Sequence, residues 1–350
     1  MKIEKSIFGN LNGKDVTMYK LINDNGMSAT FIDMGGININ LCVKGKDGEV
    51  RDVVLQYKDL DGLLENKGNF GAIVARNANR LAGASAKISG VEYKLVDNNN
   101  GNNLHSGPNF FHKNMLHAET FEEKDNVSVE FSYRFKDMEQ GFPGNMDFKI
   151  RYTLTNDNEL KLRYEAISDK DSIFNPTWHA YFNLLSHDAG DISTHKIKIF
   201  ADKITAVNEK AIPESLMDVT STPFDFRNGK FITDGIDDSH EQVKRGKGFD
   251  HNFVINGYDG TLKKAVEVVE EKVGVKMEVF TELPGVQFYT GNAINPVGIC
   301  KNGDKYAKRG GFCLETQYFP NAINDDRFVS SLIKKGEKKV YNTVYKFSLI

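Results

Sequence analysis

Alternation between apolar and polar side chains is the clearest pattern in the chain, and it lies between residues 127 and 166. Apolar and aromatic residues occupy every second position of residues 127–135, 148–154 and 160–166, with mostly polar residues between them. Because successive side chains of a β-strand point to opposite faces, each segment is predicted to be a strand with one face on a core. Three such strands in succession predict a large antiparallel sheet.

Short β-branched and aromatic runs also fill the first 56 residues, where turn-forming residues separate the runs at 16–21, 28–32, 38–43 and 53–55. Residues 24–26 and 46–48 contain Asn, Asp and Gly, which tolerate the positive φ of tight hairpin turns. These runs predict an antiparallel meander. Residues 59–66 are predicted to form a short helical turn, residues 193–200 a strand, and residues 265–269 and 275–280 a hairpin.

The connection between residues 206 and 231 is rich in turn formers, and we expect it to cover one end of a sandwich without taking part in chemistry. No linker, internal repeat or low-complexity segment stands out along the chain. The sequence therefore predicts an all-β protein in which residues 1–350 form a single domain, since sandwiches and barrels often exceed two hundred residues.

Charge and cysteine content narrow the classes of partner. The chain has 45 Lys and Arg residues against 48 Asp and Glu, a net charge of -3, and no polybasic block. This balance argues against nucleic acid or an anionic membrane as partner and favours a small neutral ligand. The three cysteines lie far apart along the chain, which predicts reduced thiols. Neither a signal sequence nor a membrane-spanning apolar run is visible, so we expect a soluble cytoplasmic protein.

Glu315 is the most unusual residue of the C-terminal third, because it follows Phe312 and Leu314 in a run apolar enough to be a buried strand. A buried carboxylate is costly unless it is paired or functional, and desolvation raises its pKa towards the range of a general base. The alternative is a structural ion pair with an arginine such as Arg80. Residue type alone leaves both interpretations open.

Histidines raise the same question at two places. His179 lies among aromatic residues near the middle of the chain, where a hydrogen-bonded core histidine is more common than an acid–base catalyst, so this segment alone favours the core interpretation. His105 lies in a loop rich in Asn and Gly, the kind of segment that carries binding groups on a rigid sheet, and is a better candidate than His112 or His117.

Polar residues in apolar surroundings supply the remaining candidates. Arg76 precedes Asn79 and Arg80 in a stretch of small and apolar residues; for Arg76 a structural network and a ligand contact are both open, whereas Asn79 and Arg80 favour a ligand. On the predicted strand from residue 250, Asp250 and Asn252 share one face, and the intervening His251 points to the core or to solvent.

Six stretches, in this order, resemble the aldose 1-epimerase (galactose mutarotase) family. They are residues 76–81, 103–107, 177–184, 248–252, 284–292 and 314–324, which include the sequences Arg76-Asn-Ala-Asn79-Arg80-Leu81, Thr177-Trp-His179-Ala-Tyr181 and Leu314-Glu315-Thr-Gln317. One such stretch would be weak, but six collinear ones are specific. The resemblance covers about residues 70–325, and the β-rich ends fit the same fold.

The resemblance implies a β-supersandwich of mostly antiparallel strands with a sugar cleft, and neither a metal nor an organic cofactor. It implies an isomerase acting on free hexoses such as galactose or glucose, as a monomer or homodimer. Carried over residue by residue, it makes Glu315 the general base, His179 the general acid and His105 a second imidazole beside the ring oxygen. Sugar hydroxyls would be held by Asn79, Arg80, Asp250, Gln287 and the backbone near Tyr181.

Trp178, the one tryptophan of the chain, departs from the family pattern, in which Asn often precedes the histidine. Strand alternation turns Trp178 away from the face that His179 uses, so we expect it to pack behind the strand, and Tyr181 to border the sugar. Two other functions remain open: a noncatalytic sugar-binding protein and an epimerase of a modified sugar. The second ranks lower because Arg80 is the one strong cation among the candidate cleft residues.

Overall fold

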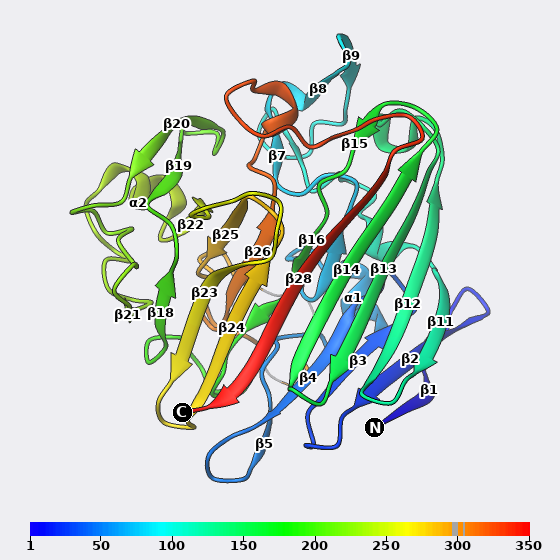
Figure 1. Cartoon of the computed structure of the whole chain (residues 1–350), viewed down its shortest axis with the longest axis vertical. Coiled ribbons are helices and arrows are strands. Elements are labelled where there is room, and N and C mark those ends of the chain that lie inside the picture. Colours follow the sequence, from blue (N-terminus) through cyan, green and yellow to red (C-terminus); the bar gives the residue numbers. More distant parts are fainter. Residues whose placement is uncertain (296–299, 304) are drawn as a thin grey trace.

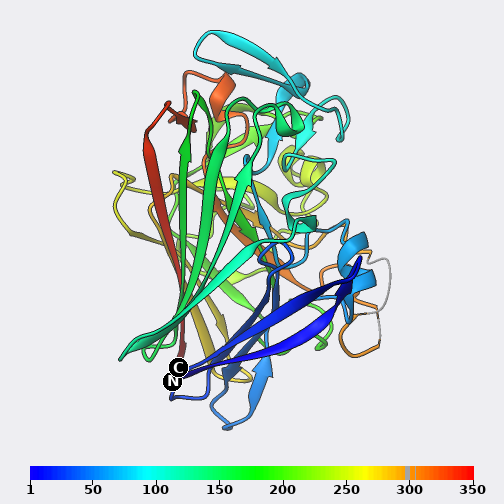
Figure 2. The same cartoon turned by 90° about the vertical axis from the view of Figure 1, so that its right-hand side faces the viewer.

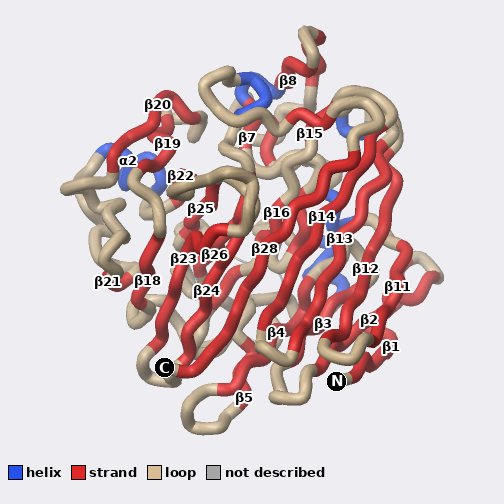
Figure 3. The backbone as a smooth tube through the Cα atoms, viewed as in Figure 1, coloured by secondary structure: helices blue, strands red, loops and turns tan. Residues whose placement is uncertain are grey.

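The computed structural model describes residues 1–295, 300–303 and 305–350, and strands dominate it (Figures 1 and 3). The largest sheet of the described residues has nine strands, and all its pairings are antiparallel. In spatial order they are β11 (His117–Glu122), β12 (Asn126–Phe135), β13 (Met146–Thr155), β14 (Glu159–Ser168), β28 (Lys338–Leu349), β24 (Val275–Thr281), β23 (Lys263–Glu270), β18 (Lys196–Ile199) and β21 (Lys230–Phe231). The three strands predicted between residues 127 and 166 are confirmed as β12, β13 and β14, and the hairpin as β23 and β24.

A six-stranded antiparallel sheet lies behind the middle of this large sheet (Figure 1). Its described strands, in order, are β17 (Tyr181–Phe182), β26 (Phe312–Gln317), β25 (Gly285–Tyr289), β22 (Asp250–Val254), β19 (Lys203–Val207) and β20 (Pro213–Asp218). The C-terminal strand β28 therefore lies in one sheet and β26, only about twenty residues earlier, lies in the other.

The N-terminal meander is confirmed as a five-stranded sheet in sequence order. Its strands are β1 (Lys2–Leu11), β2 (Lys14–Ile22), β3 (Ser28–Ile32), β4 (Asn38–Lys44) and β5 (Val50–Asp52). Figure 2 shows these blue strands at the lower end of the molecule, and the ring of Phe31 stacks on Tyr152 of β13 at 3.8 Å. Residues 53–55 were predicted to be a strand, but they hydrogen-bond across to Leu41 and Tyr181 as a linking segment, because they pass from one sheet to the next.

Short elements connect the sheets. The predicted helical turn is confirmed as α1 (Leu60–Glu65), which the side chain of Asp59 caps by accepting a hydrogen bond from the backbone of Gly62. The other short elements are α2 (Glu241–Gly246), the pairs β6 (Ala72–Val74) with β16 (Thr177–His179), β7 (Arg80–Leu81) with β10 (Asn103–Leu104), β8 (Ser85–Ile88) with β9 (Val91–Lys94), β15 (Ser172–Ile173) with β27 (Leu332–Ile333), and the 3₁₀ turns Ala82–Ala84, Phe111–Lys113, Glu139–Gly141 and Ala322–Asn324. No described helix is long and apolar enough to cross a membrane.

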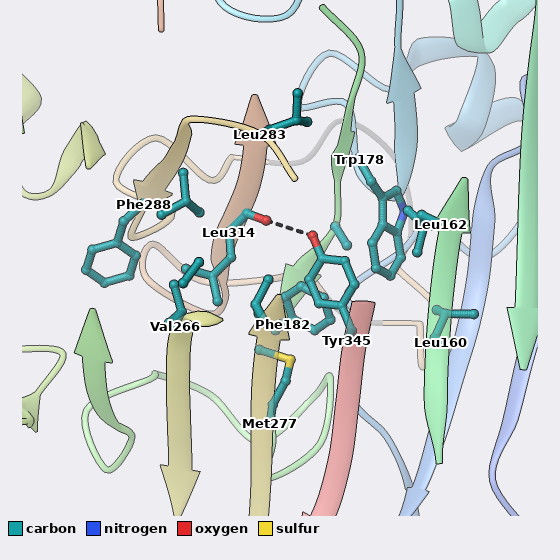
Figure 4. Packing of buried hydrophobic residues seen from close by; sticks show 14 of the residues in the cluster. Leu160, Leu162, Trp178, Phe182, Val266, Met277, Leu283, Phe288, Leu314 and Tyr345 are labelled. Atoms are coloured by element: carbon teal, nitrogen blue, oxygen red, sulfur yellow. Dashed lines mark hydrogen bonds between the residues drawn. The ribbon is translucent and has the colours of Figure 1, made fainter. Parts of the chain in front are cut away.

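The main core fills the space between the nine-stranded and six-stranded sheets (Figure 4). Tyr345 of β28 reaches across it and donates a hydrogen bond to the carbonyl of Leu314 on β26 at 2.8 Å. Trp178 packs edge-on against Phe182 and Tyr345, and its indole nitrogen donates to the carbonyl of Gly71. The expectation that Trp178 packs behind its strand is therefore confirmed, and β16 is anchored from its core side.

For Arg76 a structural network and a ligand contact were both open, and the structure shows a structural network. Its side chain is 1% exposed and its guanidinium donates to the carbonyls of Lys136 and Pro143, both at 2.8 Å. Burial lowers its pKa to about 10. These contacts fasten the loop before Asn77 to the end of the nine-stranded sheet.

Candidate active site

A cleft of about 560 Å³ opens where the ends of β16, β22, β25 and β26 meet the loops beside β7 and β10. Its volume lies within the range of small-molecule sites, about 300–1,000 Å³. The structure brings all eight residues predicted for the site to its wall: Asn79, Arg80, His105, His179, Tyr181, Asp250, Gln287 and Glu315.

The six-stranded sheet supplies the acidic side of this cleft. In the register of β22, β25 and β26, Asn252 lies opposite Gln287, and Gln287 lies opposite Glu315. Asp250, two residues before Asn252, shares its face by strand alternation. The amide nitrogen of Gln287 donates to Oδ1 of Asp250 at 2.7 Å, which fixes that carboxylate at the wall.

Glu315 is 2% exposed, and its pKa is raised well above the ordinary value of 4.5. Burial is the largest cause, because it disfavours the charged carboxylate, and the nearby charge of Asp250 adds to it. Arg80 acts in the opposite direction. Such a carboxyl group accepts a proton more readily than an ordinary glutamate, as a general base requires.

His179 faces this carboxyl group from β16. Its Nε2 lies 3.7 Å from Oε1 of Glu315, and the side chains are 7% and 3% exposed. Burial lowers the pKa of the imidazole to about 4, so the free protein holds it in the neutral form. On the other side of the ring, Nδ1 lies 3.6 Å from the thiol of Cys313. Burial therefore disfavours both charges of the acid–base pair, whose members face each other across 3.7 Å.

His105 has a defined tautomer because of its neighbour in the adjoining loop. The backbone N–H of Asn79 donates to Nδ1 of His105 at 3.1 Å, so the ring proton is on Nε2. Both residues have positive φ, 62° for Asn79 and 53° for His105, a conformation that non-glycine residues adopt at functional sites. Burial lowers the pKa of His105, and its ring lies 5.4 Å from that of His179. A neutral N–H donor thus stands beside His179.

The alternative of a structural Glu315–Arg80 ion pair is not what the described structure contains. Nε of Arg80 donates to Oδ1 of Asn99 at 2.9 Å, and the ion-pair contact of Glu315 is to His179. Tyr181 donates its hydroxyl to the carbonyl of Gly68 and forms one end of the cleft. Arg80 lines the cleft, and its positive charge counteracts the burial that raises the pKa of both Glu315 and Asp250.

His251 is a core residue, as strand alternation allowed. It is fully buried, its ring lies 4.7 Å from that of Phe224, and Nε2 lies 3.1 Å from Oε1 of Gln242. Asp250, on the opposite face, reaches the cleft. Period-two alternation thus separated a structural residue from a site residue next to it.

Sequence reasoning missed part of the cleft wall. The connection between residues 206 and 231 was expected to cover one end of a sandwich without taking part in chemistry; its residues Glu209, Lys210 and Ala211 also line the cleft. Lys67 and Tyr289 also line the cleft. Alternation along β25 from Gln287 would have found Tyr289, but the rim loops carry no such local signal.

The site has the geometry to bind a metal as well. Donor atoms of His105, His179 and Glu315 all lie within 4.8 Å of one another. Two neutral imidazoles and a carboxylate are a donor set that zinc accepts. The same three groups also provide the donor, the acid and the base of a metal-independent proton transfer, so the geometry by itself is consistent with both.

Comparison with known proteins identifies the family. The family described as aldose 1-epimerase matches residues 17–346. Galactose mutarotase from Bos taurus is 35% identical over 352 residues, covering 100% of this chain and 99% of the relative, and aldose 1-epimerase from Haemophilus influenzae is 33% identical over 349 residues, covering 99% of each.

Solved structures agree with the sequence relatives. A galactose 1-epimerase from Lactobacillus acidophilus superposes with a TM-score of 0.86 at 26% identity, covering 99% of both chains. An aldose epimerase homologue from C. elegans gives the same TM-score at 25% identity, covering 96% of this chain and 99% of its own. The sequence-based prediction of an all-β supersandwich is confirmed, and the chain belongs to the aldose 1-epimerase family.

Proposed function

We propose that this protein interconverts the α and β anomers of free hexoses such as galactose and glucose, with Glu315 as general base and His179 as general acid. The observation that carries the proposal is the buried contact of 3.7 Å between Nε2 of His179 and Oε1 of Glu315 on the wall of the 560 Å³ cleft. As a member of its family, the protein is an isomerase.

The reaction begins with one proton on the pair. In the empty cleft burial favours a neutral carboxyl and a neutral imidazole; transfer of that proton from Glu315 to His179 makes a carboxylate base and an imidazolium acid. The carboxylate then removes the proton of the C1 hydroxyl, and the imidazolium protonates the ring oxygen as the bond from C1 to that oxygen breaks. The product is the open-chain aldehyde.

Ring closure reverses these transfers. After rotation about the bond between C1 and C2, the hydroxyl that was the ring oxygen attacks the other face of the aldehyde, returning its proton to His179 while the protonated Glu315 protonates the new C1 oxygen. The Nε2–H of His105 donates to the ring oxygen, and Asp250, Gln287, Arg80 and Asn79 hold the other hydroxyls. Each positioned acid or base contributes roughly 10²- to 10⁴-fold.

Polarimetry on freshly dissolved α-D-galactose, with anomer-exchange NMR on a panel of aldoses, tests the proposal. Glu315→Gln and His179→Gln are expected to lower kcat at least about 100-fold. The matched control is Glu270→Gln, since Glu270 forms a second buried contact with a histidine, 3.6 Å from Nδ1 of His195 and away from the cleft. Full activity of Glu315→Gln, or sugar binding by the wild type without faster anomer exchange, would contradict the mechanism.

An anionic aldose such as a sugar phosphate is the second candidate substrate, because of charges on the rim. Lys67, Lys210 and Lys247 line the cleft and are exposed, and no ion pair joins them to a carboxylate of the described residues. The sequence ranked this substrate low because Arg80 was the one cation predicted for the cleft. Activity on a hexose phosphate together with none on free hexoses would make it the substrate.

We also propose a cytoplasmic location. Cys42, Cys300 and Cys313 form no disulfide bond with one another, which fits a protein that functions in a reducing compartment. Fractionation of the native cell with antibody detection would test it, and recovery of the protein outside the cytoplasm would refute it.

A further inference from the structure

Six buried polar atoms on the cleft side of the six-stranded sheet have no hydrogen-bond partner among the described residues. They are Oε2 of Glu315, Oε1 of Gln287, and both amide atoms of Asn252 and of Gln317. Asn252 is 1% exposed and Gln317 is 0% exposed. The mechanism above uses neither of these two amides, and neither lines the cleft.

The strand register places these four residues next to one another. Asn252, Gln287 and Glu315 form one row across β22, β25 and β26. Gln317 follows Glu315 by two residues, so it shares the same face, and it lies opposite Gly285.

Gly285 makes room for the amide groups. A Cβ atom on Gly285 would lie only 2.3 Å from Oδ1 of Asn252, which means that the amide of Asn252 extends over this glycine. The amide therefore reaches from β22 towards the row that contains Gln317. Because Gly285 has no side chain, the amide of Asn252 lies over it, and Gln317 is the residue opposite Gly285 on the next strand.

Buried amides left unpaired are costly, and folded proteins satisfy such groups with ordered water that makes two to four hydrogen bonds. Asn252 and Gln317 do not line the cleft, whereas their neighbours Gln287 and Glu315 do. An ordered water needs two to four polar partners, and the six atoms named above provide them on three adjacent strands.

We propose that Asn252 and Gln317 hold ordered water molecules behind Glu315, and that these waters donate hydrogen bonds to its Oε2. With Oε2 held, Oε1 is directed towards Nε2 of His179, 3.7 Å away, and towards the sugar. Asn252 and Gln317 are thus positioning residues for the base. Hydrogen bonds from water also favour the ionised carboxylate, which counteracts part of the effect of burial. The positioning role rests on the proposed function; the water site itself does not.

Gln317→Met tests the proposal, because methionine is similar in length and has no amide atoms to hold water. We expect kcat about tenfold lower with KM little changed, and a pH profile of kcat displaced to higher pH, since the carboxylate loses donors. Thr316→Val is the matched control. Thr316 is on β26 next to Gln317, so its side chain points to the opposite face of that strand. There its Oγ1 lies 2.8 Å from Oγ1 of Thr343 on β28. A merely structural change of this kind lowers Tm without moving the pH profile.

A high-resolution crystal structure decides the water site directly. We expect water within hydrogen-bonding distance of Asn252, Gln317 and Oε2 of Glu315. A dry contact between the two amides, or an unshifted pH profile in Gln317→Met, overturns the proposal. If Gln317→Met does not fold, Asn252→Ser provides the same kinetic test.

Failure of the proposed function has a separate signature. A wild-type protein that does not accelerate anomer exchange would refute that function, while the crystal structure would still decide the water site. Infrared titration of the Glu315 carboxyl group, identified by its loss in Glu315→Gln, would then decide the positioning role. An identical carboxyl pKa in wild type and Gln317→Met would refute that role.

Discussion

The charge of Asp250 is expected to set the pH range in which the Glu315–His179 pair works. The pair is active with one proton, so kcat/KM follows a bell whose two limbs report the gain of a second proton and the loss of the first. A neighbouring negative charge makes both protons harder to remove. Asp250→Asn therefore lowers both pKa values of the pair, and the whole bell moves to lower pH.

The strand arrangement provides the size of this shift. Asp250 is on β22 and Glu315 on β26, with β25 between them, and Asp250 lies two residues along β22 from Asn252, which is in the row of Glu315. Two strand spacings across and two residues along separate their backbones by roughly 12 Å. At an effective dielectric constant of about 20, two unit charges at that distance interact by about 1.4 kcal/mol, which corresponds to about one pH unit. Arg80→Met removes a positive charge that lowers the pKa of Glu315, so it moves the bell in the opposite direction.

The assay is kcat/KM for galactose anomer exchange between about pH 4 and pH 9, with the spontaneous rate subtracted. Both variants also lose a sugar contact, so KM rises. A lost contact alone, however, does not move the whole profile to lower pH in Asp250→Asn and to higher pH in Arg80→Met. Asp147→Asn is the control, because this aspartate on β13 is 61% exposed and far from the cleft in the other sheet. Shifts of the same sign in Asp250→Asn and Arg80→Met, or none larger than in Asp147→Asn, would refute the electrostatic reasoning.

Two further predictions concern stability. Trp178→Ala is expected to lower the free energy of unfolding, measured by urea denaturation, by about 3–5 kcal/mol. The control Phe231→Ala, at a position 41% exposed, is expected to lower it by less than about 1 kcal/mol. Equal losses in the two variants would contradict the packing role of Trp178. The free energy of unfolding should also fall as the pH drops from about 6.5 towards 4, because the buried histidines bind protons in the unfolded chain but stay neutral in the folded protein. A decrease smaller than that expected from the uptake of one proton on unfolding over this range would contradict the prediction. The pKa is lowered to about 4 for His179 and His195 and to about 3 for His112 and His251.

Local sequence patterns were a good guide to the strands and a poor guide to the linking segments. The alternation that predicted residues 127–135 is present in β12, where Val127, Val129 and Phe131 are fully buried. Residues 53–55 are also apolar and mostly β-branched, yet they link sheets, because strand pairing is decided by distant neighbours that no local pattern encodes.

Individual site residues were predictable to different degrees. Glu315 was marked by its own surroundings, since a carboxylate in an apolar run is unusual in any fold. His179 was not, and its interpretation changed from a core histidine to an acid only through the resemblance of the other stretches. Arg76 stayed open until the structure placed its guanidinium against backbone carbonyls. The rim residue Lys210 had no local signal, because loops reach a cleft by tertiary folding.

Alternation along the chain was enough to predict large antiparallel sheets, and the sequence also showed which residue types are available for acid–base chemistry. Periodicity is a local property, so it is readable without the fold. Only the tertiary structure decided that His105, His179 and Glu315, which lie far apart along the chain, have donor atoms within 4.8 Å of one another. It also decided their protonation, because the burial that raises one pKa and lowers the others depends on every sheet and loop packed around them.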